Sequence, residues 1–220
     1  MTAPLDGIRV IEFANFAAAP SATAIMADLG AEVIKVEAIG GDPIRCLMKQ
    51  ATVAEGDHNP DHPFQFINRG KKGIELNLDS QSGTDIARRL VAECDVVVMN
   101  LLKERRQRFG LDTDDLFSIK PDLVIGLLSG YGEVGDETNR PGYDVTAFFG
   151  RSGLYDAMRE GETGTVPMAR PAQGDHTTGL AVVAAFLAAL RRAERSGEAQ
   201  VVETSLYESS VWTQATVYAI

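Results

Sequence analysis

Residues 8–36 read IRVIEFANFAAAPSATAIMADLGAEVIKV, and this stretch determines the expected fold. Residues 8–13 are rich in β-branched side chains and predict a strand, and residues 32–36 predict a second one. Between them, residues 20–29 predict a helix, because proline is favoured in the first turn and Gly30 follows the end. A strand, a helix and another strand in this order are typical of an α/β protein with a largely parallel sheet.

The rest of the chain continues the same alternation. Further strands are expected at 74–78, 95–99, 123–128 and 201–205, and further helices at 80–92, 112–119, 175–195, after 144 and from 206 onward. Residues 37–70 show no strong period and are expected to form a long excursion. The predicted fold class is therefore α/β, an open, largely parallel, doubly wound (Rossmann-like) sheet flanked by helices. The first turn lacks the glycine fingerprint of dinucleotide-binding folds, which disfavours NAD or FAD.

The composition excludes several classes of function. A formal net charge of −10 disfavours nucleic acid and anionic membranes as partners, because both repel an acidic surface. The most apolar run, 180–190, is too short to span a bilayer, and no basic leader precedes residues 8–13, so a cytoplasmic location is expected. The two cysteines, Cys46 and Cys94, and the three histidines lack metal-ligand spacing, so no metal is expected.

The order of short motifs along the chain resembles that of family III CoA-transferases, the group that contains formyl-CoA and crotonobetainyl-CoA transferases and related acyl-CoA racemases. The motifs are GIRVIE at 7–12, ADLGAEVIKVE at 27–37, GGDPIR at 40–45, NRGKK at 68–72, DVV at 95–97, RPGYD at 140–144 and GDHTTG at 174–179. Each is weak alone, but their order and spacing together are specific. The resemblance covers nearly the whole chain, which has about half the usual length of the family. It implies that residues 1–205 form the N-terminal part of a CoA-binding large domain and that residues 206–220 begin a linker helix toward a missing small domain.

Asp175 matches the catalytic aspartate of that family. The resemblance implies that Asp175 attacks an acyl-CoA thioester, forms a mixed anhydride and then carries CoA as an aspartyl thioester. Elementary physics agrees, because a carboxylate at the start of helix 175–195 lies near unpaired N–H groups and the positive end of the helix dipole. Gly174 is expected to leave room for the thioester. The alternative is that Asp175 is only an N-cap.

The resemblance also implies which residues contact coenzyme A. These are Phe16, Ala17, Arg45, Lys71, Lys72, Asn100, Leu101, Arg108 and Tyr143. Several follow predicted strands, in agreement with ligand binding at the carboxyl ends of parallel strands. Lys71 and Lys72 equally fit a solvated turn. Tyr143 stands where the racemases carry histidine, and a phenol with a pKa of about 10 is a poor proton shuttle at neutral pH, which favours the transferase. Tyr143 equally fits a packed aromatic residue whose hydroxyl is hydrogen-bonded.

Departures from the family pattern bear on the substrate. Residues 100–104 (NLLKE) replace the usual Asn-Phe-Arg/Lys-Pro-Gly, so adenine packing is expected to differ. Ala17 lies where formyl-CoA enzymes carry glutamine, which disfavours an oxalate-type acid. Phe16, Ala17, Phe148 and Phe149 together suggest an open, less polar pocket for bulky or aromatic acyl groups.

Three functions fit the sequence. The first is a CoA-transferase that acts on an acyl-CoA and a carboxylic acid without a metal. The second is an acyl-CoA racemase or isomerase on the same scaffold. The third is a non-catalytic CoA-binding subunit of a heteromeric transferase. Because family members form interlocked dimers, we expect a homo-oligomer or a heteromer with a second chain that supplies the missing half.

Overall fold

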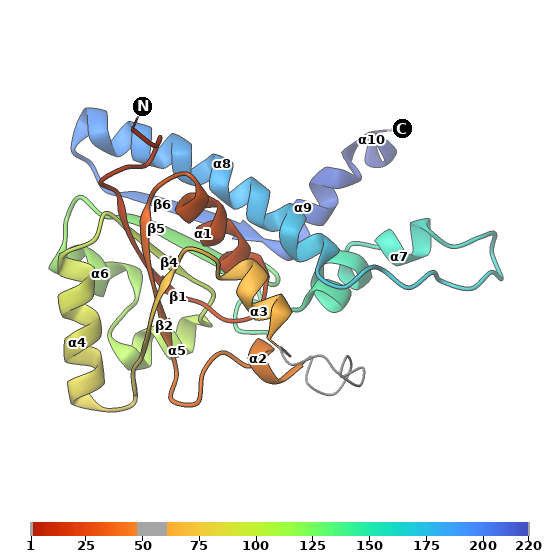
Figure 1. Cartoon of the computed structure of the whole chain (residues 1–220). Coiled ribbons are helices and arrows are strands. Elements are labelled where there is room, and N and C mark those ends of the chain that lie inside the picture. The colour runs from red at the N-terminus through yellow and green to blue at the C-terminus, as the bar shows by residue number, and fades with distance from the viewer. Residues whose placement is uncertain (1, 48–60, 220) are drawn as a thin grey trace.

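Six parallel strands form the central sheet of the computed structural model, which describes residues 2–47 and 61–219 (Figure 1). The strands are β1 (Arg9–Phe13), β2 (Glu32–Glu37), β3 (Lys72–Glu75), β4 (Val96–Met99), β5 (Val124–Ser129) and β6 (Gln200–Ser205). Their order across the sheet is β3-β2-β1-β4-β5-β6. The order reverses between β1 and β4, and in such sheets ligands bind beyond the carboxyl ends of the strands at that point.

Helices cover both faces of the sheet, so the predicted α/β class is confirmed (Figure 1). They are α1 (Ala18–Asp28), α2 (Ile44–Leu47), α3 (His62–Ile67), α4 (Gln81–Ala92), α5 (Lys103–Phe109), α6 (Thr113–Ile119), the π-helix η1 (Asp144–Arg151), α7 (Leu154–Ala157), α8 (Gln173–Ser196), α9 (Leu206–Thr213) and α10 (Ala215–Tyr218). In β4, Val96 and Val98 join the apolar cluster of α1 and α8, while Val97 and Met99 join that of α4, α5 and α6. The expectation that this strand is central and covered on both faces is therefore confirmed.

Two glycines allow α8 to pack closely enough to bring its first turn to the carboxyl edge of the sheet. A Cβ on Gly126 of β5 would lie 2.1 Å from the Phe186 ring, and one on Gly179 would lie 2.5 Å from Ser21 Oγ in α1. Side chains at these positions would displace α8. Among the described residues, no helix is both long and apolar enough to cross a bilayer.

The structure differs from the expected elements in three places. Strand β3 begins at Lys72 and ends at Glu75, earlier than the predicted strand at 74–78. Within the excursion expected at 37–70, the short helices α2 and α3 form, and residues 48–60 lie outside the described part of the chain. Helix α5 has no counterpart among the predictions, because its sequence KERRQRF buries only Arg106 and Phe109 and shows no apolar period.

Candidate active site

A cavity of about 1070 Å³ lies at the carboxyl edge of the sheet. Its walls come from the segments that follow β1, β4 and β5, from the beginning of η1 and from the first turn of α8. Among the lining residues are Asn15, Phe16, Ala17, Asn100, Leu101, Ser129, Gly130, Tyr143, Asp144, Met168, Asp175, His176 and Leu206. The location agrees with the rule for doubly wound sheets, and the volume lies at the upper end of the range of about 300–1000 Å³ for ligand pockets.

The structure brings six of the ten residues predicted for the site into the lining of this cavity. They are Phe16, Ala17, Asn100, Leu101, Tyr143 and Asp175. Asn100 also ties two strand ends together, because its side chain accepts the N–H of Asn15 at 3.0 Å and donates to the carbonyl of Asn15 at 2.8 Å. The amide of Asn100 therefore fixes the segment after β1 from which Phe16 and Ala17 extend.

The remaining four predicted residues, Arg45, Lys71, Lys72 and Arg108, do not belong to the described lining of the cavity. Arg45 stacks 3.4 Å from the centre of the Phe64 ring and pairs with Glu37 at 2.8 Å. Lys72 and Arg108 are exposed and pair with Glu32 and Asp79. The side chain of Lys71 is buried, and its ammonium group pairs with Glu12. Contact of these four with CoA stays a prediction.

The carboxyl group of Asp175 stands in the first turn of α8, next to a second carboxyl group. Burial and, after it, the charge of Asp144 together raise the pKa of Asp175 to about 7. Asp144 begins η1, and its Oδ1 accepts the N–H of Gly174 at 2.9 Å. Its Oδ2 is buried without a hydrogen-bond partner in the described part of the chain. Burial also raises the pKa of Asp144, although the N–H of Gly174 opposes this effect.

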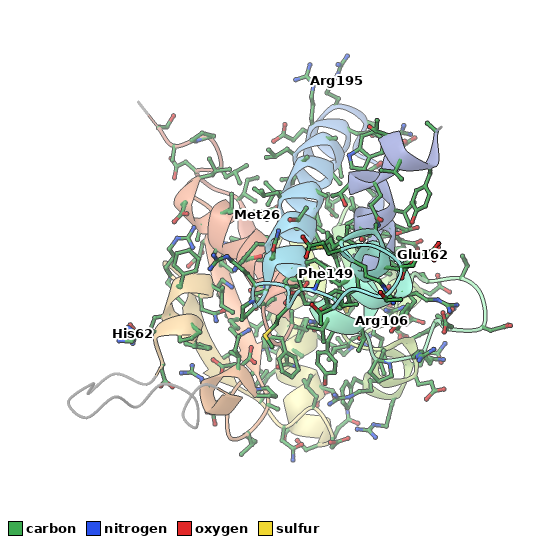
Figure 2. The ribbon with its side chains drawn as sticks, turned by 90° about the vertical axis from the view of Figure 1, so that its right-hand side faces the viewer. Met26, His62, Arg106, Phe149, Glu162 and Arg195 are labelled. Atoms are coloured by element: carbon green, nitrogen blue, oxygen red, sulfur yellow. The ribbon has the colours of Figure 1, made fainter. Side chains whose placement is uncertain are left out.

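Two sequence expectations about this region are wrong. The space beside Gly174 is not open to a thioester, since a Cβ there would lie 2.3 Å from Phe148 Cγ and 2.4 Å from Asp144 Oδ1. The glycine instead lets Asp144 reach the beginning of α8. Phe148 and Phe149 do not form the pocket wall, because they are 3% and 1% exposed and belong to the hydrophobic core. Figure 2 shows Phe149 in the interior of the molecule.

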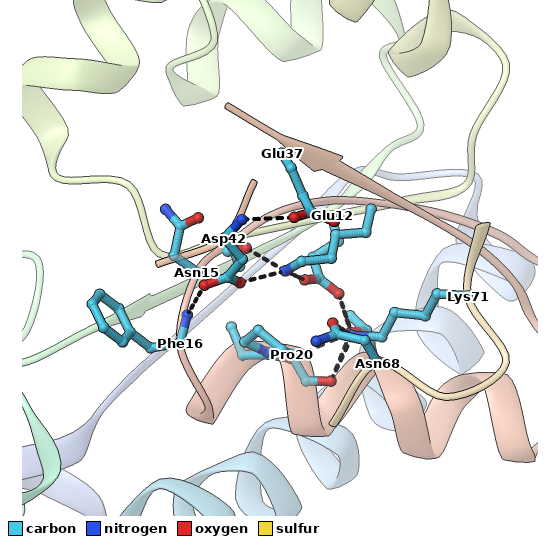
Figure 3. Close-up of polar contacts among 12 residues, drawn as sticks. Glu12, Asn15, Phe16, Pro20, Glu37, Asp42, Asn68 and Lys71 are labelled. Carbon is cyan, nitrogen blue, oxygen red and sulfur yellow. Dashed lines mark hydrogen bonds and ion pairs between the residues drawn. The ribbon is translucent and has the colours of Figure 1, made fainter. Parts of the chain in front are cut away.

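Beneath the segment after β1 lies a group of four buried charges, Glu12, Lys35, Asp42 and Lys71, which we call the ion cluster (Figure 3). Lys35 Nζ lies 2.7 Å from Glu12 Oε1 and 2.9 Å from Asp42 Oδ2. Lys71 Nζ lies 2.7 Å from Glu12 Oε2. Burial alone would raise the pKa of Glu12, but the two lysines hold it below its ordinary value. Burial lowers the pKa of Lys71 to about 8.

The ion cluster supports one wall of the cavity through Asp42. Oδ1 of Asp42 accepts the N–H of Phe16 at 3.1 Å and that of Ile44 at 3.0 Å. Phe16 has a φ of 62°, in the left-handed region that a residue other than glycine rarely adopts. Its ring meets the Tyr143 ring edge-to-face, with 5.3 Å between centroids. Asp42 thus holds a strained residue that presents its ring to the cavity.

The sequence predictions missed several residues that the structure places in or beneath the cavity. Asp144, His62, His176 and Arg105 line it, and Glu12, Lys35 and Asp42 support it. One signal was present for the second group, since a glutamate and a lysine interrupt two otherwise apolar strands. For Arg105 no such signal existed, because the helix that carries it shows no apolar period.

Fold and cavity together define a doubly wound α/β protein with a candidate active site centred on a carboxyl group. The chain belongs to CoA-transferase family III, whose family model matches residues 5–220. The resemblance found in the motifs is thereby confirmed.

Three similar proteins are CoA-transferases of bacteria. The chain is 36% identical to (R)-2-hydroxy-4-methylpentanoate CoA-transferase of Clostridioides difficile, over 97% of this chain and 53% of the relative. It is 38% identical to cinnamoyl-CoA:phenyllactate CoA-transferase of Clostridium sporogenes, over 94% and 50%. It is 34% identical to the succinyl-CoA–L-malate CoA-transferase alpha subunit of Chloroflexus aurantiacus, over 94% and 47%.

A solved structure agrees with the fold. The crystal structure of Rv3272 from M. tuberculosis superposes with a TM-score of 0.91 at 34% identity, over 99% of this chain and 59% of that one. The chain therefore spans about half the length of the relatives it matches.

Proposed function

We propose that this chain is the N-terminal, CoA-binding half of a CoA-transferase, with Asp175 as the nucleophile. The observation that supports this most is that the Asp175 carboxyl lines a large cavity at the carboxyl edge of the sheet and has a pKa of about 7. A carboxylate whose pKa lies near the working pH is a stronger nucleophile than an ordinary one, and about half of it is ionised when the pH equals that pKa. Residues 1–205 are proposed as the CoA-binding domain, and residues 206–220 as the start of the link to a second domain.

The reaction uses the Asp175 carboxylate twice. First, its oxygen bonds to the thioester carbonyl carbon while the carbon–sulfur bond breaks, which gives a mixed anhydride and CoA thiolate. The thiolate then attacks the aspartyl carbonyl, so the first acid leaves and CoA remains on Asp175 as a thioester. The second acid attacks that carbonyl and reverses the sequence. One thioester is exchanged for another, so the proposed reaction is near energetic balance.

The arrangement around Asp175 suits a long acyl-CoA. Phe16, Ala17 and Leu101, which follow β1 and β4, are proposed to contact the pantetheine arm and the acyl group, and Tyr143 to lie beside the reacting carbonyl. Asn100 holds the segment after β1 in place. Arg105, which is exposed in the cavity lining, is proposed to contact a phosphate. Arg45, Lys71, Lys72 and Arg108 would reach CoA only after a rearrangement of the contacts they make here.

We further propose that the acid substrates are apolar rather than small dicarboxylates. Phe16, Tyr143, Met168 and Leu206 supply much of the lining. Two of the relatives are named for a branched or an aromatic acid. The activity is proposed to need further polypeptide, from a second copy or a separate chain, since the chain spans half of its relatives and one of those is named as an alpha subunit.

Trapping tests the proposed nucleophile. The chain is incubated with cinnamoyl-CoA and hydroxylamine, which converts an activated aspartyl carbonyl to a hydroxamate, and the peptides are analysed by mass spectrometry. We expect modification at Asp175 that requires the acyl-CoA and is absent from the Asp175→Asn variant. Asp156→Asn, at an exposed position in α7, is the matched control and should label normally. Labelling that persists in Asp175→Asn would overturn the assignment.

A second candidate, an acyl-CoA racemase or isomerase, is favoured by the same raised pKa, because a carboxyl group that titrates near neutrality also serves as a general base. The discriminating measurement is incorporation of deuterium at the α-carbon of an acyl-CoA in D₂O without an acceptor acid. Exchange in the wild type that is lost in Asp175→Asn would favour this candidate over the transferase.

A further inference from the structure

Two carboxyl groups from different helices, Asp144 and Asp175, line the same cavity. Asp144 comes from the beginning of η1 and Asp175 from the first turn of α8, and both line the cavity. Within residues 2–47 and 61–219, no lysine or arginine forms an ion pair with either of them. Asp144 is buried, and its Oδ2 has no hydrogen-bond partner among these residues.

The backbone fixes this closeness. Asp144 Oδ1 accepts the N–H of Gly174, the residue directly before Asp175, at 2.9 Å. Only glycine leaves space for this contact, since a Cβ at position 174 would lie 2.4 Å from the same oxygen. Asp144 therefore cannot move away from the helix terminus without losing its hydrogen bond, and its charge stays beside Asp175.

We propose that Asp144 is a positioning residue that destabilises the ionised form of Asp175 and so favours the covalent, uncharged form of that side chain. This inference rests on the proposed function of Asp175 as the nucleophile. When the Asp175 oxygen attacks a thioester, the carbon–sulfur bond breaks and the negative charge leaves with the CoA thiolate. Asp144 repels the charge of free Asp175, but it meets no charge at that position in the anhydride or the aspartyl thioester.

The raised pKa of Asp175 also reflects the destabilisation of its carboxylate. Asp144 is the charge that raises this pKa, after burial. The charge of Asp144 destabilises the Asp175 carboxylate relative to the protonated acid. It destabilises the carboxylate to a similar extent relative to the acylated side chain, because the protonated and the acylated forms are both neutral. Each pKa unit that Asp144 contributes corresponds to about a tenfold change in such an equilibrium.

Other ionisable groups line the same cavity. Along the described lining of the cavity they are Tyr143 on η1, His176 on α8, His62 on α3 and Arg105 on α5. Burial is the largest influence on the pKa of Asp144 and raises it, while a positive charge on His176 lowers it.

The test removes the charge of Asp144 and keeps its shape. In Asp144→Asn, an amide oxygen still accepts the N–H of Gly174. The carboxyl carbon of Asp175 is followed by NMR in protein labelled with ¹³C-aspartate, and Asp175→Asn identifies its signal. We expect the wild-type midpoint near 7 and a midpoint at least one unit lower in Asp144→Asn, with acyl-CoA-dependent labelling of Asp175 reduced about tenfold or more.

The outcomes separate this inference from the proposed function. If the midpoint falls in Asp144→Asn but the wild type is never labelled by acyl-CoA, the electrostatic pair stands and the transferase proposal fails. If the wild type is labelled but Asp144→Asn changes neither the midpoint nor the labelling, Asp144 is only a helix cap and the inference is overturned. A lower melting temperature with an unchanged midpoint has the same meaning.

Asp156→Asn is the charge-matched control for this test. Asp144→Ser also offers an oxygen to the N–H of Gly174, and it replaces Asp144→Asn if that variant does not fold.

Discussion

Two regions of this molecule bury carboxyl groups, and they do so with opposite results. In the ion cluster, Glu12 and Asp42 lie against Lys35 and Lys71, and the pKa of Glu12 is lowered. At the beginning of α8, Asp144 accepts the N–H of Gly174, no lysine or arginine in the described part of the chain pairs with Asp144 or Asp175, and both pKa values are raised. Burial disfavours the charge in both regions, so the partners decide the sign. The first arrangement supports the structure, and the second is the one that we propose to hold the nucleophile.

The largest predicted effect is the loss of CoA transfer when Asp175 is replaced. If the pair at α8 holds the nucleophile, Asp175→Asn removes the attacking oxygen and lowers CoA transfer by a factor on the order of 10³ or more. The measurement is transfer between two acids in the assembled protein, followed by chromatography of the acyl-CoA products. Glu203→Gln, in β6 outside the lining of the cavity, should leave the rate unchanged. A comparable loss of activity in Glu203→Gln, or full activity of Asp175→Asn, would show that the carboxyl pair at α8 does not hold the nucleophile.

The next effect concerns the stability of the ion cluster. Lys35→Met keeps most of the side-chain volume but leaves Glu12 and Asp42 with one ammonium group fewer in a buried site. Breaking a buried ion pair in this way costs about 3–5 kcal/mol of unfolding free energy, which urea titration measures. Lys72→Met is the matched control, because its exposed pair with Glu32 contributes about 0–1 kcal/mol. Equal losses in the two variants would show that the cluster is not a special source of stability.

The opposite pKa directions predict opposite pH dependences. The pKa of Asp175 rises from an ordinary 3.8 to about 7 on folding, so between these values the folded state binds more protons and its stability falls as the pH rises. Asp175→Asn removes this cost and should stabilise the protein by about 2–4 kcal/mol at pH 8, a gain that shrinks as the pH falls to 5. Glu12 has a lowered pKa, so its stabilisation is present above its ordinary 4.5 and is lost in acid.

Urea unfolding of Asp175→Asn and the wild type between pH 5 and 8 checks this prediction. Asp156→Asn, at an exposed position in α7, should change the stability by no more than about 0.5 kcal/mol at any of these values. If Asp175→Asn instead loses stability at pH 8, the carboxylate is stabilised at the beginning of α8, and the contrast between the two regions does not hold.

The two regions also differ in how far the sequence predicted them. Asp175, Tyr143 and Phe16 belong to motifs that follow or precede recognisable elements, and the structure places all three at one cavity. The six strands likewise follow from local runs of β-branched residues, with only β3 displaced. Such features depend on short stretches of chain, so local patterns suffice to find them.

The ion cluster could not be assembled from local patterns. Glu12 and Lys71 are 59 positions apart, and their contact depends on the path of the chain through the excursion before β3. The pairing of Asp144 with the N–H of Gly174 spans 30 positions and depends on the packing of η1 against α8. Helix α5 was missed for another reason, because a charged segment with two buried residues carries no periodic signal.

The smallest predicted effect concerns the backbone of both regions, because each contains one residue other than glycine in the left-handed conformation. Phe16 has a φ of 62° and is held by Asp42, and Ala172 has a φ of 60° directly before α8. A left-handed residue with a Cβ costs about 1–2 kcal/mol, partly offset by the greater entropy that glycine has when unfolded. Ala172→Gly should therefore stabilise the protein by about 0.5–1 kcal/mol in urea titration.

The matched control for this substitution is Ala181→Gly, at an exposed position within α8, which should cost about 1 kcal/mol. Ala172 also packs against the small apolar cluster of Ala17, Ile44 and Ile67. If Ala172→Gly destabilises the protein as much as Ala181→Gly does, the lost methyl contact outweighs the relief of strain. The beginning of α8 would then be held by side-chain packing, whereas Phe16 is held by its hydrogen bond to Asp42, and the two regions would differ in this respect.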